Sequence, residues 1–528
     1  MRILTPGQMK IAERMAVESG TSYERLMENA GRGAAEHILQ CFFRAEGEKL
    51  PGKNVLVLLG KGNNGGDGLV IARRLLEEVP GLRVTLLFGL GRKLSELAAL
   101  NLKRLAPFKE RVTMLDGEEV NNQELKSLCS KSHLIIDGIF GTGFSGQLPE
   151  KIARLLRVAN GSKAVRIALD IPSGMDCCSG VLDADTFRAR ITYTFAAMKP
   201  AHLLKRSRGL CGDKQTVEIG ITEEMMEQIS GSITYLDAQT VRGALPSRQE
   251  DSNKGSYGKL LIIGGCASMS GAVLLSSMAA YRCGVGLVMT AAPETALTAV
   301  RMQLPEAIHC VLPLGETGAV SPENGDMLAQ KLNRWSSAAL IGCGMSVTEE
   351  SKAVVRQLLT ETEKPMVIDA DGLNCIAVMG EEGMKLLENA KAPLILTPHM
   401  LEFSRLSGMS IDGIKADRFT IAQDFATKHH LTLVLKDSNT VIASPDGELY
   451  MNDNGNSGLS KGGSGDVLAG MVASFLAQGA QPVQAAICGV YLHAAAGDAA
   501  ERHLTAYGML PSDVIDCIPE AFGELLWM

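Results

Sequence analysis

The stretch from Gly455 to Gly470, GNSGLSKGGSGDVLAG, combines residue types that could bind an anion and move a proton. Three of its glycines, Gly462, Gly463 and Gly465, stand just before an apolar run typical of a helix. Backbone N–H groups at a helix start lie at the positive end of the helix dipole and bind anions such as phosphate. Asp466 follows at once, where a carboxylate can take a proton from a hydroxyl lying beside that phosphate. The simpler alternative is that Asp466 only caps the helix and the glycines only form a turn.

A second glycine-rich stretch, Gly60-Lys-Gly-Asn-Asn-Gly-Gly-Asp67, follows a strand-like apolar run in the first half of the chain. It matches G-x-G-x-x-G, but the next strand runs into Gly89-Leu-Gly-Arg92 and supplies no acid for a ribose, so a redox dinucleotide in that pose is not expected. The chain has no Gly-Lys-Ser/Thr sequence of a Walker loop. Asn63 and Asn64, at the mouth of the following helix, could serve a phosphate and a cation together.

Two more predicted strands in the first half end in carboxylates. Asp137 precedes the glycine loop Gly141–Gly146, and Asp170 precedes Ser173 in the sequence Asp-Ile-Pro-Ser. Either acid taken alone is more simply a helix cap. Two acids beside loops whose glycines allow close backbone approach favour a ligand site.

In the second half, polar residues again follow predicted strands. The sequence CASMSGA opens a helix near Ala272, Gly344 ends a strand, and DADGLN and LTPHMLE place Asp371 and His399 at later strand ends. Each of these residues has a structural alternative, since Asp371 could cap a helix and His399 could be an exposed loop residue. Together they face one crevice, because ligands of open α/β sheets lie outside the carboxyl ends of the strands.

The elements that position these residues alternate as strand and helix in two series. Residues 5–45 read as helical, and the glycine stretch ending at Asp67 reads as a loop before a helix over Gly68–Glu77. Such alternation predicts mostly parallel sheets with helices on both faces, that is, α/β class with two three-layer α/β/α domains. Between about 222 and 254 the chain becomes polar and irregular, which suggests a domain boundary. The apolar runs predict strands at Asn54–Leu59, Arg83–Phe88, His133–Asp137, Val165–Asp170, Ile191–Phe195, Gln215–Ile219, Lys259–Ile263, Leu287–Ala291, Ala338–Ile341, Met366–Asp369, Leu394–Leu396 and Thr432–Leu435, with a hairpin over 440–452.

Composition limits the partners. A chain of 528 residues with net charge −7 and no long basic run has no electrostatic footprint for nucleic acid or an acidic membrane, so small-molecule ligands are expected. The 12 cysteines form no C-x-x-C pair, and no apolar run reaches the length of a membrane span. These features predict a cytoplasmic protein, and folds of this size commonly form symmetric homo-oligomers.

The first-half motifs GKGNNGGDG, DGIFGTGFSG and ALDIPSGMD resemble the epimerase domain that acts on hydrated NADH and NADPH, a Rossmann-like domain. The resemblance implies an epimerase domain over residues 1–222. It implies potassium ligands at Asn64, Asp137 and Ser173, and a reacting carboxylate at Asp170. The hydrated dinucleotide would contact Asp170 and the residues Asn63, Asn64, Gly65, Gly66, Asp67, Gly141, Thr142, Gly143, Phe144, Ser145 and Gly146.

The second-half motifs NKGSYGKLLIIGG, DADGLN, LTPHMLEF and GNSGLSKGGSGDVLAG resemble the ribokinase-like, nucleotide-dependent dehydratase of hydrated NADH and NADPH. The resemblance implies a dehydratase domain over 232–528, joined to the first domain by a linker at 223–231. Its loop departs from the more usual Gly-Met-Ala-x-Gly-Gly-x-Gly-Asp, with Leu459 and Ser460 in place of Met-Ala. Hydrate contacts are implied at Ala272, Gly344, His399 and Asp466, and nucleotide contacts at Lys436, Asp437, Ser438, Asn439, Thr440, Gly462, Gly463 and Gly465.

Taken together, the resemblances imply a bifunctional metabolite repair enzyme. Its epimerase would interconvert the R and S hydrates of NADH and NADPH with K⁺ bound. Its dehydratase would convert the S form to NAD(P)H at the expense of ADP with Mg²⁺, giving AMP and phosphate, and the residues alone do not separate ADP from ATP. Two alternatives are a sugar or vitamin kinase fused to a dinucleotide-binding module, and a dinucleotide sensor that regulates the second half.

Overall fold

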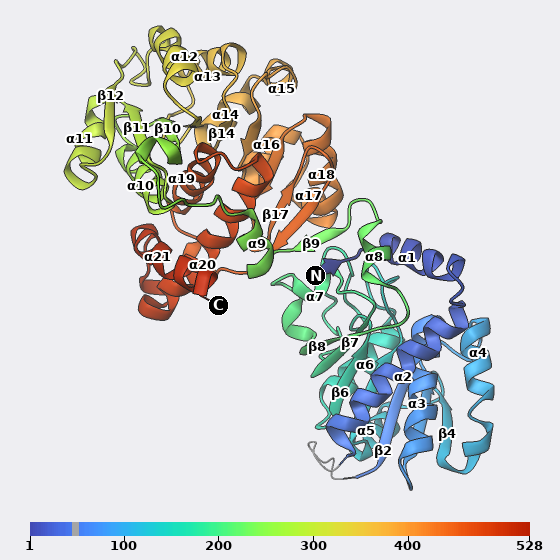
Figure 1. Ribbon diagram of the computed structural model, residues 1–528. Helices are drawn as coiled ribbons and strands as arrows, with labels where there is room; N and C mark the ends of the chain where they lie inside the picture. The colour runs from blue at the N-terminus through green and yellow to red at the C-terminus, as the bar shows by residue number, and fades with distance from the viewer. Residues whose placement is uncertain (45–51, 528) are drawn as a thin grey trace. The chain divides into compact units, whose positions relative to one another are not determined.

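The computed structural model describes residues 1–44 and 52–527, and the chain in it divides into two compact units between Ser232 and Ile233. Residue 45, at the end of the first predicted helical region, and Met528, at the end of the second predicted domain, lie outside the described residues. Each unit is a mostly parallel sheet covered by helices (Figure 1), which confirms the predicted α/β class. Residues 223–231 contain a short helix, α8 (Glu223–Glu227).

The first unit is built on a parallel sheet of order β4-β3-β2-β5-β6-β7-β8. Alternate residues of the central strand face opposite layers, with Val55, Val57 and Leu59 packing in one apolar cluster and Leu56 and Leu58 in the other. Helices α1 to α4 contribute to the first cluster, and α5 and α6 to the second. The elements are β1 (Arg2–Ile3), α1 (Pro6–Glu18), α2 (Tyr23–Phe42), β2 (Asn54–Leu59), α3 (Asn63–Glu78), β3 (Arg83–Phe88), α4 (Glu96–Lys103), η1 (Ala106–Arg111), β4 (Val112–Asp116), α5 (Asn122–Lys131), β5 (Leu134–Gly138), α6 (Glu150–Asn160), β6 (Val165–Leu169), β7 (Ile191–Phe195), α7 (Pro200–Leu203), η2 (Arg208–Leu210) and β8 (Asp213–Val217).

The second unit has a larger sheet, in which the strands run in the order β9-β18-β17-β16-β15-β14-β13-β10-β11-β12. Its β17–β18 pair is antiparallel, as the hairpin prediction requires, and so is its β16–β17 pair, whereas its other strand pairs are parallel. The strands are β9 (Ile233–Tyr235), β10 (Lys259–Ile263), β11 (Leu287–Ala292), β12 (Ile308–Val311), β13 (Ala338–Ile341), β14 (Met366–Ile368), β15 (Leu394–Leu396), β16 (Thr432–Leu435), β17 (Thr440–Ala443) and β18 (Leu449–Asn452).

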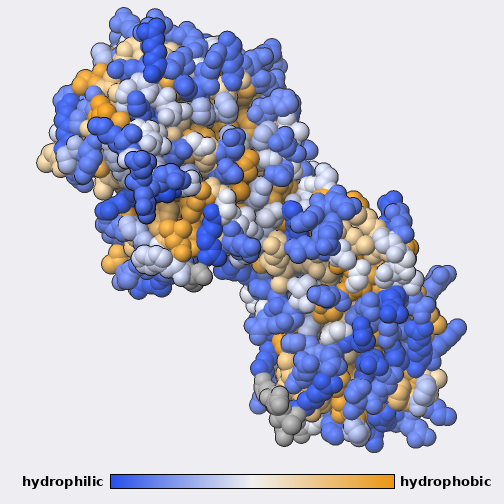
Figure 2. Space-filling view, in the orientation of Figure 1, coloured by the Kyte–Doolittle hydropathy of each residue, from blue (hydrophilic) through white to orange (hydrophobic). Residues whose placement is uncertain are grey.

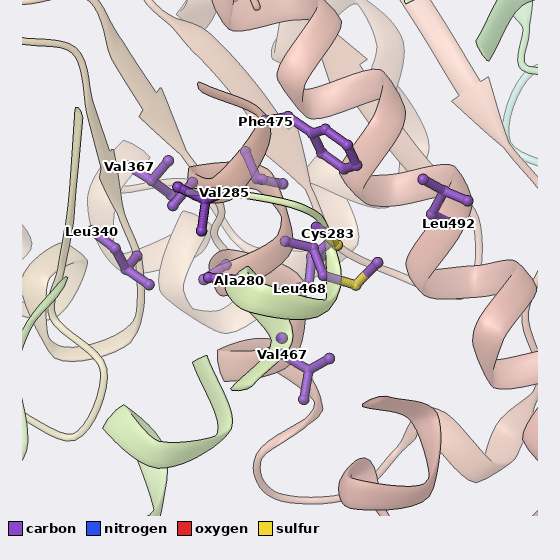
Figure 3. Packing of buried hydrophobic residues seen from close by; sticks show 14 of the residues in the cluster. Ala280, Cys283, Val285, Leu340, Val367, Val467, Leu468, Phe475 and Leu492 are labelled. Carbon is purple, nitrogen blue, oxygen red and sulfur yellow. The ribbon is translucent and has the colours of Figure 1, made fainter. Parts of the chain in front are cut away.

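Helices lie on both faces of this second sheet (Figure 1). One layer, formed by α9, α10, α11, α19, α20 and α21, shares an apolar cluster with the sheet, and α12 to α18 lie on the other side. Figure 3 shows part of that cluster, where Val467, Leu468 and Phe475 of α19 lie near Ala280 of α10. The helices are α9 (Ala238–Ala244), η3 (Lys254–Tyr257), α10 (Ser270–Arg282), α11 (Glu294–Gln303), η4 (Pro322–Asn324), α12 (Gly325–Arg334), α13 (Glu349–Glu361), α14 (Ala370–Val378), α15 (Glu381–Glu388), α16 (Met400–Ser407), α17 (Ile411–Ala416), α18 (Arg418–Lys428), η5 (Ser457–Leu459), α19 (Ser464–Ala477), α20 (Pro482–Gly508) and α21 (Pro511–Trp527).

The main correction concerns the start of α3. The glycine stretch ending at Asp67 was expected to be a loop, but the helix begins at Asn63 and includes both glycines of the Gly-Gly pair. These glycines allow close packing, since a Cβ on Gly65 would lie 2.4 Å from the Gly60 carbonyl oxygen and one on Gly66 would lie 2.6 Å from Met27. Close packing therefore offsets the low helix propensity of glycine.

Surface polarity agrees with the composition. On the face shown in Figure 2, hydrophilic residues cover most of the visible surface of each unit. In the described ranges, no helix is both long and apolar enough to cross a membrane.

Candidate active sites

The first unit contains a cavity of about 450 Å³ at the carboxyl ends of its central strands. Its wall brings together three carboxylate residues, Glu13, Asp67 and Asp170, and three lysines, Lys10, Lys61 and Lys199. Of the predicted hydrate contacts, the lining includes Asn63, Asn64, Asp67, Gly141, Thr142, Gly143, Phe144 and Asp170, and does not include Gly65, Gly66, Ser145 or Gly146. Most of the hydrate contacts that the sequence predicted in the first half therefore lie around one cavity.

Asp170 has an unusual backbone and a fixed side chain. Its φ is +61°, in the left-handed region that non-glycine residues rarely adopt and that often marks functional sites. Its Oδ1 accepts a hydrogen bond of 2.5 Å from Nζ of Lys199, whose side chain is 1% exposed. Its Oδ2 faces the Gly141 turn, because a Cβ on Gly141 would lie 3.5 Å from that oxygen. One oxygen is thus anchored, while the other points toward the cavity.

The two carboxyl groups that neighbour Asp170, those of Asp67 and Glu13, have raised pKa values. Burial raises the pKa of Asp67 well above its usual range, and the negative charges of Asp170 and Glu13 add to the effect. Burial also raises the pKa of Glu13, again with help from Asp170. The cavity therefore holds one carboxylate paired with a lysine and two carboxyl groups that keep their protons more readily.

Asn64, Asp137 and Ser173, the predicted potassium ligands, form a connected group behind the cavity. Asp137 accepts hydrogen bonds from the Ser173 hydroxyl (2.7 Å) and the Ser173 N–H (2.8 Å), and burial raises its pKa to about 6. The Nδ2 of Asn64 donates hydrogen bonds to the carbonyls of Phe140 (2.7 Å) and Leu169 (3.1 Å). Its Oδ1 is buried without a hydrogen-bond partner, which fits an oxygen reserved for a hard cation.

In the second unit, the glycine loop lies at the start of α19. Gly463 is the N-cap residue with φ +98°, so the alternative in which Asp466 is the cap is wrong. Within the described chain, the N–H groups of Gly462, Gly463 and Gly465 donate to no backbone carbonyl. Free N–H groups at the positive end of a long helix form the expected anion site.

Asp466 lies one residue beyond that loop, in a partly buried position. Burial raises its pKa to about 6, the charge of Asp369 raises it further, and a hydrogen bond from Cys343 and the charge of Lys436 act in the opposite direction. A carboxylate with such a pKa accepts a proton more readily than an ordinary aspartate. This suits a general base that works near neutral pH.

Lys436, a predicted nucleotide contact, forms an ion pair that the sequence did not reveal. Its Nζ lies 2.7 Å from Oδ1 of Asp369, whose side chain is 1% exposed, and a Cβ on Gly465 would lie 3.4 Å from the same Nζ. Although burial lowers the pKa of Lys436, the charges of Asp369 and Glu402 raise it, and the net direction is upward. A permanent positive charge therefore lies beside the anion loop.

Of the other predicted hydrate contacts, Gly344 and His399 follow strands, and Ala272 lies in the first turn of α10. Gly344 (φ +64°) meets Ala272, because a Cβ on Gly344 would lie 3.0 Å from the Ala272 Cβ. His399 pairs with Lys436 in an isolated parallel bridge, which places these two residues side by side. His399 is also the N-cap of α16, where its Nδ1 accepts hydrogen bonds from the N–H groups of Leu401 and Glu402, each at 3.2 Å. This helix cap explains the ring position on structural grounds alone, so the substrate role of His399 stays a prediction.

The remaining nucleotide candidates follow Lys436 in the turn between β16 and β17. Asp437 pairs with the buried Arg418 at 3.2 Å, Ser438 is exposed, and Asn439 is buried. Thr440 begins β17. The ion pair of Asp437 with Arg418 thus holds the turn in place, and Ser438 is exposed to solvent.

Several residues of these sites escaped the sequence analysis. Lys199, Asp369 and Cys343 come from segments distant in sequence from the residues they contact. Glu13 and Glu402 act on Asp67 and Lys436 through their charges, and Glu402 also contacts His399, three positions before it. Only Asp369 carried a recognisable pattern, since it is the last residue of a predicted strand, and it directly follows the observed strand β14. A third set of residues lines a cavity of about 400 Å³ at the amino ends of the second sheet, but it contains none of the predicted site residues.

The fold and sites define a two-site α/β enzyme, and comparison with known proteins identifies its family. The family model of NAD(P)H-hydrate dehydratase matches residues 260–520, and that of the YjeF-related protein N-terminus matches residues 23–201. The bifunctional NAD(P)H-hydrate repair enzyme of Moorella thermoacetica is 35% identical over 95% of this chain and 92% of its own length. That of Salinibacter ruber is 34% identical over 99% of this chain and 97% of its own length.

Among solved structures, the ADP/ATP-dependent NAD(P)H-hydrate dehydratase of Bacillus subtilis, co-crystallised with ATP and Mg²⁺, is 29% identical. The match covers 56% of this chain and 99% of that one, with a TM-score of 0.48. From the full-length relatives, the chain belongs to the family of bifunctional NAD(P)H-hydrate repair enzymes. The predicted epimerase and dehydratase activities are thereby confirmed, and the kinase alternative is not supported.

Proposed function

We propose that Asp170 and Asp466 are the catalytic carboxylates of two separate reactions. Epimerisation of the R and S hydrates is assigned to residues 1–222, and dehydration of the S hydrate to residues 232–528, with 223–231 between them. The observation that carries the proposal is that each carboxylate lies at a carboxyl edge of a parallel sheet, beside a glycine-rich turn. Each site therefore offers a proton acceptor next to backbone that a ligand can approach closely.

For epimerisation, the bond between the carbinol carbon and its oxygen or the ring nitrogen must break and form again on the other face. If the ring bond opens, Asp170 accepts the carbinol hydroxyl proton through Oδ2, and Asp67, whose raised pKa favours its protonated form, gives a proton to the ring nitrogen. If the hydroxyl leaves instead, Asp67 protonates it, and Asp170 accepts a proton from the water that returns to the other face. The proton is transferred back as the bond re-forms, so the reaction consumes nothing. The hydrated dinucleotide would contact the turn from Gly141 to Gly146 and the start of α3.

Potassium would be held by Asn64, Asp137 and Ser173. The partnerless Oδ1 of Asn64 and the buried carboxylate of Asp137 form a donor set of hard oxygens that fits this ion. When bound, K⁺ supplies a fixed positive charge that orders the ends of β5 and β6. Asn64 connects these three potassium candidates to the cavity, because its Nδ2 donates to the carbonyl of Phe140, which lines the cavity.

For dehydration, Asp466 takes the proton of the carbinol hydroxyl, and the oxygen attacks the terminal phosphoryl group of ADP, releasing AMP. The N–H groups of Gly462, Gly463 and Gly465, with Lys436, stabilise the charge on the transferring group. Phosphate then leaves as the ring nitrogen donates its lone pair, and loss of a proton from the adjacent carbon restores the dihydropyridine ring. Mg²⁺, when bound, neutralises phosphate charge.

The residues fit an Mg²⁺ that arrives on the nucleotide. Within the described chain, no cluster of three His, Cys, Asp or Glu side chains could hold a metal ion, and Mg²⁺ commonly binds through substrate phosphates and water. Ala272, Gly344 and His399 would contact the hydrate, and Lys436 to Thr440 the nucleotide. A homo-oligomer in the cytoplasm remains our expectation from the sequence.

The proposal is tested by supplying the full-length protein with a mixture of hydrate epimers, with ADP or ATP, and following the return of NAD(P)H absorbance. We expect a fast phase from the S hydrate and a slower phase as the R hydrate epimerises. No recovery with either nucleotide would contradict the dehydratase proposal. A second phase no faster than spontaneous epimerisation would contradict the epimerase proposal.

A further inference from the structure

Asp170 is held by one short part of the chain, residues 193–202, which we name the clamp segment. The Asp170 N–H donates to the Tyr193 carbonyl at 2.7 Å, and the Asp170 carbonyl accepts from Nε2 of His202 at 2.8 Å. Its carboxylate accepts from Lys199 at 2.5 Å. Because a left-handed aspartate is strained, such a residue persists only where its surroundings determine its conformation.

Lys199 has no hydrogen left for a substrate. Its ammonium donates to Oδ1 of Asp170, to Oγ1 of Thr194 (2.9 Å) and to the carbonyl of Phe195 (2.8 Å). Three hydrogen bonds exhaust an ammonium, and the side chain is 1% exposed. Lys199 therefore acts on Asp170 rather than directly on the hydrate.

His202 holds the other end of Asp170 and is linked to Lys199. Its Nδ1 accepts a hydrogen bond from the Lys199 backbone N–H at 3.1 Å, which assigns the ring proton to Nε2, the atom that faces the Asp170 carbonyl. Burial, aided by the charge of Lys199, lowers the pKa of His202 to about 3, so the ring stays neutral. The two residues thus fix the backbone and the carboxylate of Asp170 together.

We propose that Lys199 and His202 are positioning residues for epimerisation, which anchor Asp170 so that only its Oδ2 meets the hydrate. The inference rests on the proposed role of Asp170. Neither residue is assigned a contact with the hydrate, because the polar atoms of both side chains point at Asp170 and the clamp segment.

The test follows epimerisation alone, using one purified epimer and no ADP, with the full-length protein. Lys199→Met should lower kcat about 100-fold, since a small displacement of a reacting group has effects of this size. KM should stay within about threefold, because Lys199 makes no substrate contact. His202→Phe should show a smaller loss of kcat, and His202→Gln, which keeps a donor near the Nε2 position, should retain more activity than His202→Phe.

Chemical rescue separates positioning from a purely structural role. Lys199→Ala leaves a cavity that methylammonium can fill, whereas Lys199→Met fills the space with an apolar chain. We expect added methylammonium to restore kcat several-fold in Lys199→Ala and not in Lys199→Met. ADP-dependent dehydration of the S hydrate by the same variants should equal that of the parent protein.

Two results would overturn the inference. One is a Lys199→Met enzyme that epimerises within threefold of the parent. The other is a parallel loss of kcat, hydrate affinity and thermal stability without rescue, which would assign Lys199 to the fold alone. Asp170→Ala is measured beside these variants. If Asp170→Ala stays active, the proposed role of Asp170 is wrong. If Asp170→Ala is inactive while the Lys199 and His202 variants stay active, only the inference about the clamp segment is wrong.

Discussion

A lysine lies close to each of the two proposed catalytic carboxylates, but it binds a different partner in each unit. In the first unit, Lys199 binds Asp170 itself, at 2.5 Å. In the second, Lys436 binds the neighbour Asp369 at 2.7 Å, and Asp466 keeps a pKa raised to about 6. A lysine bound directly to the carboxylate fixes the orientation of that carboxylate, whereas a lysine bound to a neighbouring acid leaves both oxygens of the catalytic carboxylate free of an ion pair with that lysine.

This difference matches the two reactions. Epimerisation returns its proton in each cycle and depends on placing one oxygen against a carbon that is attacked from both faces. Dehydration requires the net removal of a hydroxyl proton while a phosphoryl group is transferred. The same pair of residue types therefore serves orientation in one unit and proton uptake in the other.

The sharpest way to break this comparison is to remove the free carboxylate. Asp466→Asn should lower the dehydration rate about 1,000-fold or more, because the amide cannot accept the proton. The return of NAD(P)H absorbance with S hydrate and ADP measures this loss. Asp446→Asn makes the same chemical change at an exposed turn and should leave the rate unchanged. Near-normal turnover of Asp466→Asn would remove Asp466 from the mechanism.

Removing the paired carboxylate should affect only the other reaction. Asp170→Ala should lower enzymatic epimerisation at least about 100-fold, so that NAD(P)H recovery stops after the S hydrate is consumed and continues only at the spontaneous rate. Progress curves on mixed epimers show where recovery stops. Asp213→Ala, at an exposed strand end of the same unit, is the matched control. Rapid consumption of both epimers by Asp170→Ala would contradict its role.

The potassium proposal sharpens the contrast between the units. Replacing K⁺ by Li⁺ should slow epimerisation about tenfold, because Asn64, Asp137 and Ser173 would lose a well-fitting ion, a loss comparable to other disturbed metal sites. Dehydration, measured in the same solutions with Mg²⁺ and ADP, should not depend on the alkali ion. Equal sensitivity of both reactions would argue against a potassium site confined to the first unit.

The smallest predicted effect is a pH shift. Because Asp466 must be ionised to act as a base, kcat/KM for dehydration should fall below about pH 6, by up to about tenfold per pH unit. Asp369→Asn removes a charge that raises this pKa and frees Lys436 to lower it, so the fall should move to lower pH by about one unit. A pH–rate profile that is unchanged in Asp369→Asn would contradict the coupling.

The sequence predicted the buried parts of the fold better than the edges. Central strands such as β2 and β13 are continuous apolar runs with the predicted bounds. The strands β4 and β12 were missed because they lie at sheet edges and none of their residues is fully buried, so neither forms an apolar run that could be recognised. The start of α3 was placed five residues late because glycine suggests a loop, whereas here it allows packing against Gly60 and Met27.

Site residues could be predicted where they directly follow a strand. Their binding partners could not be predicted, because those partners come from other parts of the chain. Asp137 and Asp170 stood out by position, and the structure places Asp170 on the cavity and Asp137 beside it. Lys199 follows β7, but nothing in the sequence says that its ammonium binds Asp170, 29 positions earlier. Long-range ion pairs depend on the tertiary fold. The different lysine contacts of the two carboxylates can therefore be seen only in the structure.

The most direct test of two independent sites is a mixing experiment with Asp170→Ala and Asp466→Asn in full-length protein. Each variant alone should leave part or all of a mixture of hydrate epimers unrepaired in the presence of ADP. Combined, they should restore NAD(P)H from both epimers faster than spontaneous epimerisation allows, because one supplies the epimerase and the other the dehydratase. Recovery by the mixture no faster than by Asp170→Ala alone would contradict the assignment of one carboxylate to each reaction.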